Sequence, residues 1–186
     1  SEPVTQASLR MSGAFWALDK GLAQQRHFPA INWSQSYTLY DGMLAPWFRE
    51  NLGEEWFALR DYLKDLLERE QSLLELVQLV GREGLSEEDK WLLELAELLR
   101  IVFLQQNAFD PVDAFTSPLK AKRLLDLFYD LDHCVSAHLR KGLVVDQIPR
   151  TFLREALFRL RALGEEELFR EGKLLWQSFG AQLASE

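Results

Sequence analysis

The sequence predicts a mainly α-helical protein, with a helical bundle over residues 41–186 that follows a short helix and strand within residues 1–40. Two observations lead to this prediction. From about residue 42 onward, apolar residues recur with a period near 3.6 along most of the chain. Short breaks at glycine or proline separate these stretches, and long amphipathic helices joined by short connections favour an antiparallel bundle. We expect five or six helices in it.

The first forty residues have a different sequence pattern. Residues 5–24 predict a helix, because apolar residues recur there at near-helical spacing. Pro29 interrupts that pattern and favours an extended conformation at Phe28. We therefore expect a short strand around residues 28–33. The loop after it is expected to pass through Ser34, Ser36 and Tyr37.

Capping residues predict where the helices of the bundle begin and end. Gly81 and Gly84 end the first long helical stretch. Ser86 is placed to cap the next helix, and the carboxylates that follow it favour the positive end of the helix dipole. The polar stripe of this helix is narrow, so we expect residues 91–104 to be largely buried.

A second irregular stretch covers residues 107–117. Ser117 and Pro118 are a typical N-cap and first-position pair, and they predict a helix that runs to Gly142. Two more helices are expected over residues 150–163 and 165–183.

Composition narrows the classes of function. The 186 residues carry a net charge of −8, which argues against general binding to nucleic acid, because no basic stripe is present to neutralise phosphates. The single cysteine excludes an intramolecular disulfide and suits a reducing compartment. No apolar run approaches the roughly 20 residues of a membrane span. The chain starts at Ser1 without an initiator methionine, and we expect it to begin inside a longer protein.

No metal site or nucleophile is expected. His133, Cys134 and His138 fall on one predicted helix, but they offer only three ligands of mixed direction. A packed cysteine beside surface histidines is the ordinary arrangement. His27 precedes Phe28 and is better interpreted as a contact at the strand end than as a catalytic base.

Three phenylalanines lie in turn-prone segments: Phe28 beside Pro29, and Phe109 and Phe115 on either side of Pro111. They have two interpretations. Each ring can fill a core, which is the common fate of phenylalanine. Alternatively, the rings form a flat slot for a base such as adenine, where stacking on an aromatic ring contributes about 1–3 kcal/mol. The chain contains no phosphate loop of the form GxxxxGK[ST].

The segments FWALDKGLAQQRHFPAINWSQSY and FLQQNAFDPVDAF closely resemble the C-terminal third of the catalytic A subunit of V/A-type rotary ATPases. The opening SEPVTQASLR is similar to the segment that leads into that region. The resemblance covers essentially the whole chain and is looser after residue 117. It implies that residues 1–40 are the C-terminal remnant of an α/β nucleotide-binding domain and that residues 41–186 are the C-terminal helical bundle domain.

The resemblance also implies a site. Phe28 corresponds to the aromatic residue at the strand end beside adenine, Phe109 to that of the facing loop, and Val112 and Phe115 complete the pocket. The family's phosphate loop, catalytic glutamate and Mg²⁺ ligand lie upstream of Ser1, so no catalytic residue is assigned. ATP or ADP with Mg²⁺ is expected in the intact subunit. The isolated fragment is expected to bind no cofactor and to be inactive.

A second site is implied at the turn before the helix that Ser86 caps. It resembles the end of the acidic helix–loop–helix with which F-type catalytic subunits contact their rotating shaft. The ordinary alternative is a capped, solvated turn. The residues implied in stalk contact are Leu85, Ser86, Glu87, Glu88 and Asp89.

The function implied is ATP hydrolysis or synthesis coupled to H⁺ or Na⁺ translocation by a rotary motor. The implied partners are the B subunits of the catalytic hexamer and the central-stalk subunits, with no nucleic acid and no direct membrane insertion. The implied location is cytoplasmic, peripheral on the membrane in the head of the complex. The alternative is a helical protein-interaction module with no nucleotide role, whose aromatic residues serve as core and interface anchors.

Overall fold

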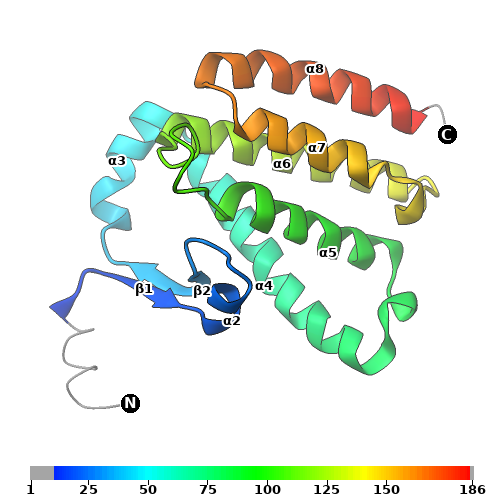
Figure 1. The fold of residues 1–186 in the computed structure, drawn as a ribbon, viewed down its shortest axis with the longest axis horizontal. Helices are drawn as coiled ribbons and strands as arrows, with labels where there is room; N and C mark the ends of the chain where they lie inside the picture. The colour runs from blue at the N-terminus through cyan, green and yellow to red at the C-terminus, as the bar shows by residue number, and fades with distance from the viewer. Residues whose placement is uncertain (1–10, 185–186) are drawn as a thin grey trace.

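The fold, described over residues 11–184 by a computed structural model, is a helical bundle with a small sheet at one end (Figure 1). Strand β1 (Ala14–Leu18) pairs antiparallel with β2 (Ile31–Thr38), and α2 (Lys20–Gln24) lies between them in the sequence. The mainly α fold class is therefore confirmed. The bundle comprises α3 (Asp41–Leu52), α4 (Trp56–Val80), α5 (Glu87–Leu99), α6 (Pro118–Leu139), α7 (Arg150–Arg161) and α8 (Glu165–Ala184), with 3₁₀ turns at Arg82–Gly84 and Val145–Gln147 and a π-helical turn at Arg100–Leu104.

The predicted helix caps are confirmed. The Ser86 hydroxyl accepts a hydrogen bond from the Asp89 amide at 3.1 Å, which satisfies a free donor in the first turn of α5. Ser117 does the same for the Lys120 amide in α6. Gly81 follows α4 with a φ of 75°, a backbone conformation in which a side chain would be strained.

The prediction for the first segment is wrong in part. Residues 14–18 of the predicted helix 5–24 form β1, and residues 5–10 lie outside the described range. The predicted loop after residue 33 is also wrong, because β2 continues through Thr38. The cause is pairing with a distant segment: Ser36 Oγ accepts from the Ala17 amide at 3.0 Å and donates to the Asn32 carbonyl at 2.6 Å. The hydroxyl thereby bridges an irregularity in the β1–β2 register.

The main core lies where the apolar faces of α4 to α8 meet. As predicted, residues 91–104 are largely buried, and Trp91, Leu95 and Ala96 are almost fully excluded from solvent. Phe128 occupies the middle of α6 within the same cluster. A second, smaller cluster joins α6, α7 and α8 around Leu160. The two clusters make the bundle a rigid base for the loops that it supports.

Asp132 on α6 joins three helices. Its carboxylate accepts hydrogen bonds from the Trp91 indole of α5 at 2.8 Å, from the Tyr62 hydroxyl of α4, and from Ser136 of α6 at 3.1 Å. Burial, followed by the negative charge and hydrogen bond of Asp132, raises the pKa of the Tyr62 phenol. Tyr62 therefore stays a hydrogen-bond donor to Asp132.

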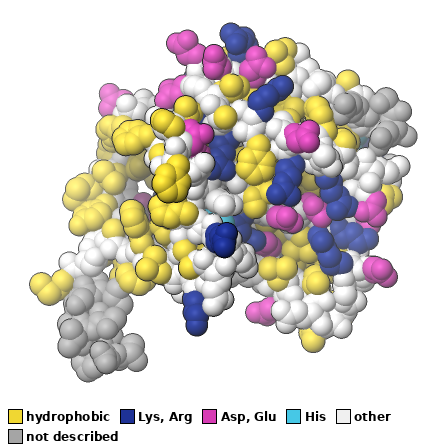
Figure 2. All heavy atoms as spheres, in the orientation of Figure 1, with side chains coloured by type: hydrophobic (Ala, Val, Ile, Leu, Met, Phe, Trp, Pro, Cys, Tyr) yellow, Lys and Arg dark blue, Asp and Glu magenta, His cyan; other side chains and the backbone are white. Residues whose placement is uncertain are grey.

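The sheet and α3 expose an apolar surface. Figure 2 shows hydrophobic side chains gathered at the left of the molecule, over the region where α3 and the sheet lie. An exposed patch of this kind is typical of a surface that contacts other protein. Its exposed side chains include Trp16, Leu18, Leu39, Met43 and Trp47.

Candidate functional site

Two segments that are distant in the sequence meet at one end of the bundle. The Gln106 amide donates a hydrogen bond to the Phe28 carbonyl at 2.6 Å. This bond ties the segment after α2 to the irregular segment between the π-helical turn and α6, which we call the aromatic loop (residues 105–117). Phe28 and Phe109 both line a cavity of about 770 Å³ there, whose lining also includes Phe158 and Arg161 at the end of α7.

The phenylalanine rings of these segments are not core residues. Phe109 is 98 % exposed, Phe115 is 88 % exposed and Phe28 is 56 % exposed. The structure brings Phe28 and Phe109 to one cavity, but Val112 and Phe115 are not among the residues that line it. Both remain exposed to solvent on the aromatic loop. A flat apolar ligand in this cavity would therefore touch two of the four predicted residues in this conformation.

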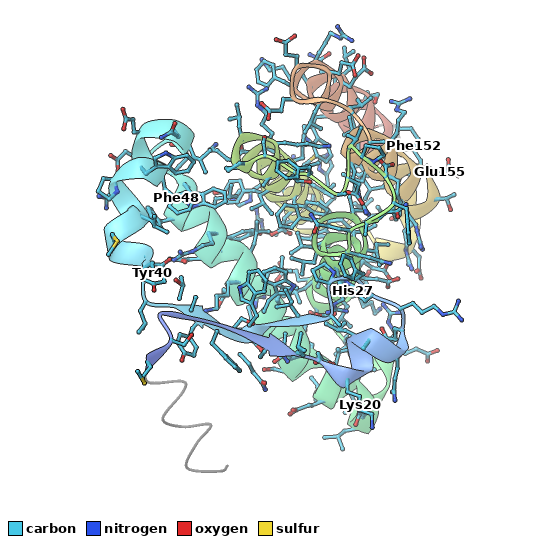
Figure 3. The ribbon with its side chains drawn as sticks, turned by 60° about the vertical axis from the view of Figure 1, so that its left-hand side comes forward. Lys20, His27, Tyr40, Phe48, Phe152 and Glu155 are labelled. Carbon is cyan, nitrogen blue, oxygen red and sulfur yellow. The ribbon has the colours of Figure 1, made fainter. Side chains whose placement is uncertain are left out.

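His27 lies where the segment after α2 meets the bundle (Figure 3). Its side chain is buried, with Nδ1 3.2 Å from the Pro29 carbonyl and Nε2 3.2 Å from the Arg100 carbonyl in the π-helical turn. The imidazole thus bridges two backbone segments. It holds Phe28 beside the π-helical turn, in keeping with a positioning contact.

An ion pair anchors the aromatic loop to α7. Arg161 donates through Nε to Asp113 Oδ1 at 2.6 Å and through Nη2 to Oδ2, a two-pronged arrangement that only a guanidinium provides. Its third nitrogen, Nη1, donates to the Ile101 carbonyl at 3.0 Å. Asp113 Oδ2 also accepts from the Asn107 amide, two residues before Phe109. The side chains of Arg161 and Asp113 are only 11 % and 7 % exposed.

The charge of Asp113 is favoured by its surroundings. Burial alone would raise the pKa of this carboxyl, but hydrogen bonds from Arg161 and Asn107 and the charges of Arg161 and Lys120 hold it below the ordinary 3.8. Lys120 is also buried, and desolvation lowers the pKa of its ammonium, whose Nζ has no hydrogen-bond partner within residues 11–184. Arg161 alone therefore makes the hydrogen bonds that neutralise Asp113 from the bundle side.

Acid should release the aromatic loop. Because the folded-state pKa of Asp113 lies below its unfolded value, the ion pair contributes its full stability above that unfolded value and loses it as the pH falls through the folded pKa. We expect the NMR shift of the Asn107 amide to be constant near neutral pH and to move below about pH 4. An Asp113→Asn variant should lack this step. An unchanged titration in that variant would contradict the assignment to Asp113.

The second predicted site forms an elbow between α4 and α5 (residues 81–89), far along α4 from α3 (Figure 1). Ser86 and Glu88 are exposed, whereas Leu85 is buried beneath the turn. Glu87 is engaged within the molecule, accepting from the Val145 amide at 2.7 Å and from Lys90 at 2.6 Å. The surface available to a partner is therefore centred on Ser86 and Glu88.

The two remaining histidines and the cysteine lie on α6. His133 and His138 each place Nδ1 near a backbone carbonyl one turn earlier, and Cys134 is half-buried, with its pKa raised by burial. Between residues 11 and 184, no three potential ligands cluster closely enough for a metal ion. None of the helices in that range is both long and apolar enough to cross a membrane.

Sequence reasoning found the aromatic residues but missed their supports. Asp113 lies inside the aromatic loop, and its position between Val112 and Ala114 in an otherwise apolar stretch was a usable signal for a buried polar contact. Arg161 gave no such signal. It is one of four arginines on α7, and only the tertiary structure shows that it alone reaches the aromatic loop.

Together these features define a helical-bundle protein with a cavity where the segment after α2, the aromatic loop and the end of α7 meet. A family model described as the C-terminal domain of V and A type ATP synthase matches residues 45–141, just over half of the chain. The chain belongs to this family.

The chain is similar to longer proteins. It is 44 % identical over 167 residues to the A subunit of an A-type ATP synthase from Haloferax volcanii, covering 90 % of this chain and 28 % of that protein. The figures are 46 % over 148 residues (80 % and 25 %) for the corresponding A-type protein from Hyperthermus butylicus. A V-type ATP synthase alpha chain from Anaeromyxobacter sp. strain K is 45 % identical over 168 residues (90 % and 29 %). The chain thus spans less than a third of the length of these relatives.

Proposed function

We propose that this chain is the C-terminal region of the catalytic A subunit of a V/A-type proton- or sodium-translocating ATP synthase, and that its aromatic loop and Phe28 hold adenine. The meeting of two distant segments at one cavity, with both rings exposed, is the observation on which this proposal rests. Family membership and the names of the similar proteins support it. Residues 1–40 are then the end of the nucleotide-binding domain, and residues 41–186 are the bundle domain.

In this proposal, the chain supplies adenine contacts and no chemistry at phosphate. A pocket without a phosphate loop gains only stacking energy, which the entropy cost of immobilising a nucleotide largely offsets. In this proposal the phosphate and Mg²⁺ contacts belong to other parts of the intact protein, and the isolated chain should not hydrolyse ATP.

The surfaces of the molecule fit an assembly. We assign the elbow, through Ser86 and Glu88, to contact with the central stalk, because it is a protruding turn on a rigid helix pair. The exposed apolar side chains of the sheet and α3 are assigned to the rest of the nucleotide-binding domain and to neighbouring B subunits. The complex would hold this region on the cytoplasmic side, peripheral to the membrane.

Replacing Phe28 or Phe109 with alanine in the full-length protein should weaken ATP binding roughly 5- to 150-fold, the equivalent of one base-stacking contact. Equilibrium titration measures this change. Inorganic tripolyphosphate, which lacks the base, should bind as tightly to the variants as to the parent. Phe169→Ala, which removes a half-exposed ring from α8, is the control and should change neither affinity. Equal ATP affinity in all proteins would remove the adenine role and favour a protein-interaction module.

A further inference from the structure

We propose that Arg161 is a positioning residue for the adenine pocket, which acts from α7 by fixing the aromatic loop through Asp113. This inference rests on the proposed function, because it gives Arg161 a part in the site proposed there. It extends the pocket to α7, which lies beyond the residues that the family model matches.

The contacts form a continuous chain from α7 to the ring. Arg161 grips both oxygens of Asp113, and Asp113 Oδ2 accepts from the Asn107 amide. The Asn107 side chain in turn accepts from the Phe109 amide at 3.0 Å. Each bond fixes the next, so the position of the Phe109 ring depends on Arg161. The ring itself is 98 % exposed, so packing contributes little to holding it.

The same guanidinium also fixes the base of the loop. Its bond to the Ile101 carbonyl lies within the π-helical turn, where the regular ladder of helical hydrogen bonds is disturbed. His27, which precedes Phe28, contacts the carbonyl of the neighbouring residue Arg100. Arg161 and His27 therefore hold adjacent residues of the π-helical turn, so the Phe28 segment and the aromatic loop are both anchored to this turn.

A lysine would not replace this arginine. The site needs three donors aimed at two carboxylate oxygens and one carbonyl, and an ammonium is a compact point charge without that fork. Lys120 illustrates the difference. It is buried near Asp113, yet its Nζ makes no hydrogen bond within the described residues. A positive charge alone therefore does not hold the aromatic loop to α7.

The first test uses the chain itself, without nucleotide. Arg161→Met should increase the hydrogen-exchange rate of the Asn107 and Phe109 amides at least tenfold while leaving the core amides of α5 unchanged. Arg159→Met is the matched control, because Arg159 is an exposed neighbour on the same helix and has no part in the ion pair with Asp113. Unchanged exchange in Arg161→Met would overturn the proposal. Arg161→Lys, which keeps the charge, should give an intermediate rate.

The second test measures ATP and tripolyphosphate binding by the full-length protein. Arg161→Met should weaken ATP binding about tenfold and leave tripolyphosphate unchanged, and it should have no further effect in a Phe109→Ala background. An equal loss with and without Phe109, or an equal loss for both ligands, would overturn the positioning role. If Phe109→Ala weakens ATP binding and Arg161→Met does not, this inference alone fails. If neither variant changes ATP binding, the proposed function fails with it.

Discussion

Replacing Phe128 with alanine should lower the free energy of unfolding by about 3–5 kcal/mol, the usual cost of deleting a buried ring. Its side chain is fully buried in the middle of α6, where the core cluster joins that helix to its neighbours. The alanine would leave a cavity that these helices cannot close without shifting their backbones. Chemical denaturation of the chain, with the midpoint and slope both fitted, measures the change.

A graded series separates the cavity from other effects. Phe128→Leu keeps most of the apolar volume and should cost clearly less than the alanine variant. Phe169→Ala removes the same ring from a half-exposed position on α8 and should cost least. A Phe128→Ala loss no greater than that of Phe169→Ala would show that α6 is not at the centre of the core.

Replacing Asp132 with alanine should cost about 3 kcal/mol, because hydrogen bonds to a charged acceptor are strong and their buried donors become unsatisfied. The Trp91 indole is the main donor left without a partner, since its residue is almost completely buried. The Tyr62 hydroxyl loses the same acceptor. One change therefore loosens α4 and α5 from α6 together. The measurement is again the free energy of unfolding, with near-ultraviolet circular dichroism to follow the packing of Trp91.

Asp130 provides the matched control for Asp132. It lies two residues away on α6, is exposed, and makes no hydrogen bond or ion pair within the described residues. Asp130→Ala should change stability by less than about 0.5 kcal/mol. Asp132→Asn, which keeps one oxygen acceptor, should fall between the two alanine variants. Equal losses of stability for the alanine variants at positions 130 and 132 would show that Asp132 does not join the three helices.

The bundle was predictable because local signals agree with the tertiary structure. Ser86, Ser117 and Pro118 mark helix starts by the hydrogen bonds that they make or do not need, and these bonds form within a few residues. The β1 strand was not predictable in this way. Its short apolar run fits a helix or a strand, and pairing with β2 decides between them.

The candidate site also contains residues that the sequence singled out and residues that only the tertiary structure shows. Proline and turn context singled out Phe28 and Phe109, and the structure brings both to one cavity. Their roles as adenine contacts remain a prediction. The ion pair of Arg161 with Asp113 was invisible in the sequence, because it joins residues 48 positions apart through side chains that periodicity treats as ordinary surface charges.

Ion pairs hold helix α7 at both of its ends, and the two ion pairs differ in their exposure to solvent. At its start, exposed Arg150 shares Glu94 with Arg82 of the elbow, at 3.0 Å to each. At its C-terminal end, about 18 Å away, Arg161 pairs with the buried carboxylate of Asp113. Dissolved ions screen the partly exposed Arg150–Glu94–Arg82 contact more than the buried Arg161–Asp113 pair. Rising ionic strength should therefore weaken the Arg150–Glu94–Arg82 contact, while the buried Arg161–Asp113 pair and the packing of Leu153 and Leu157 keep α7 in the bundle.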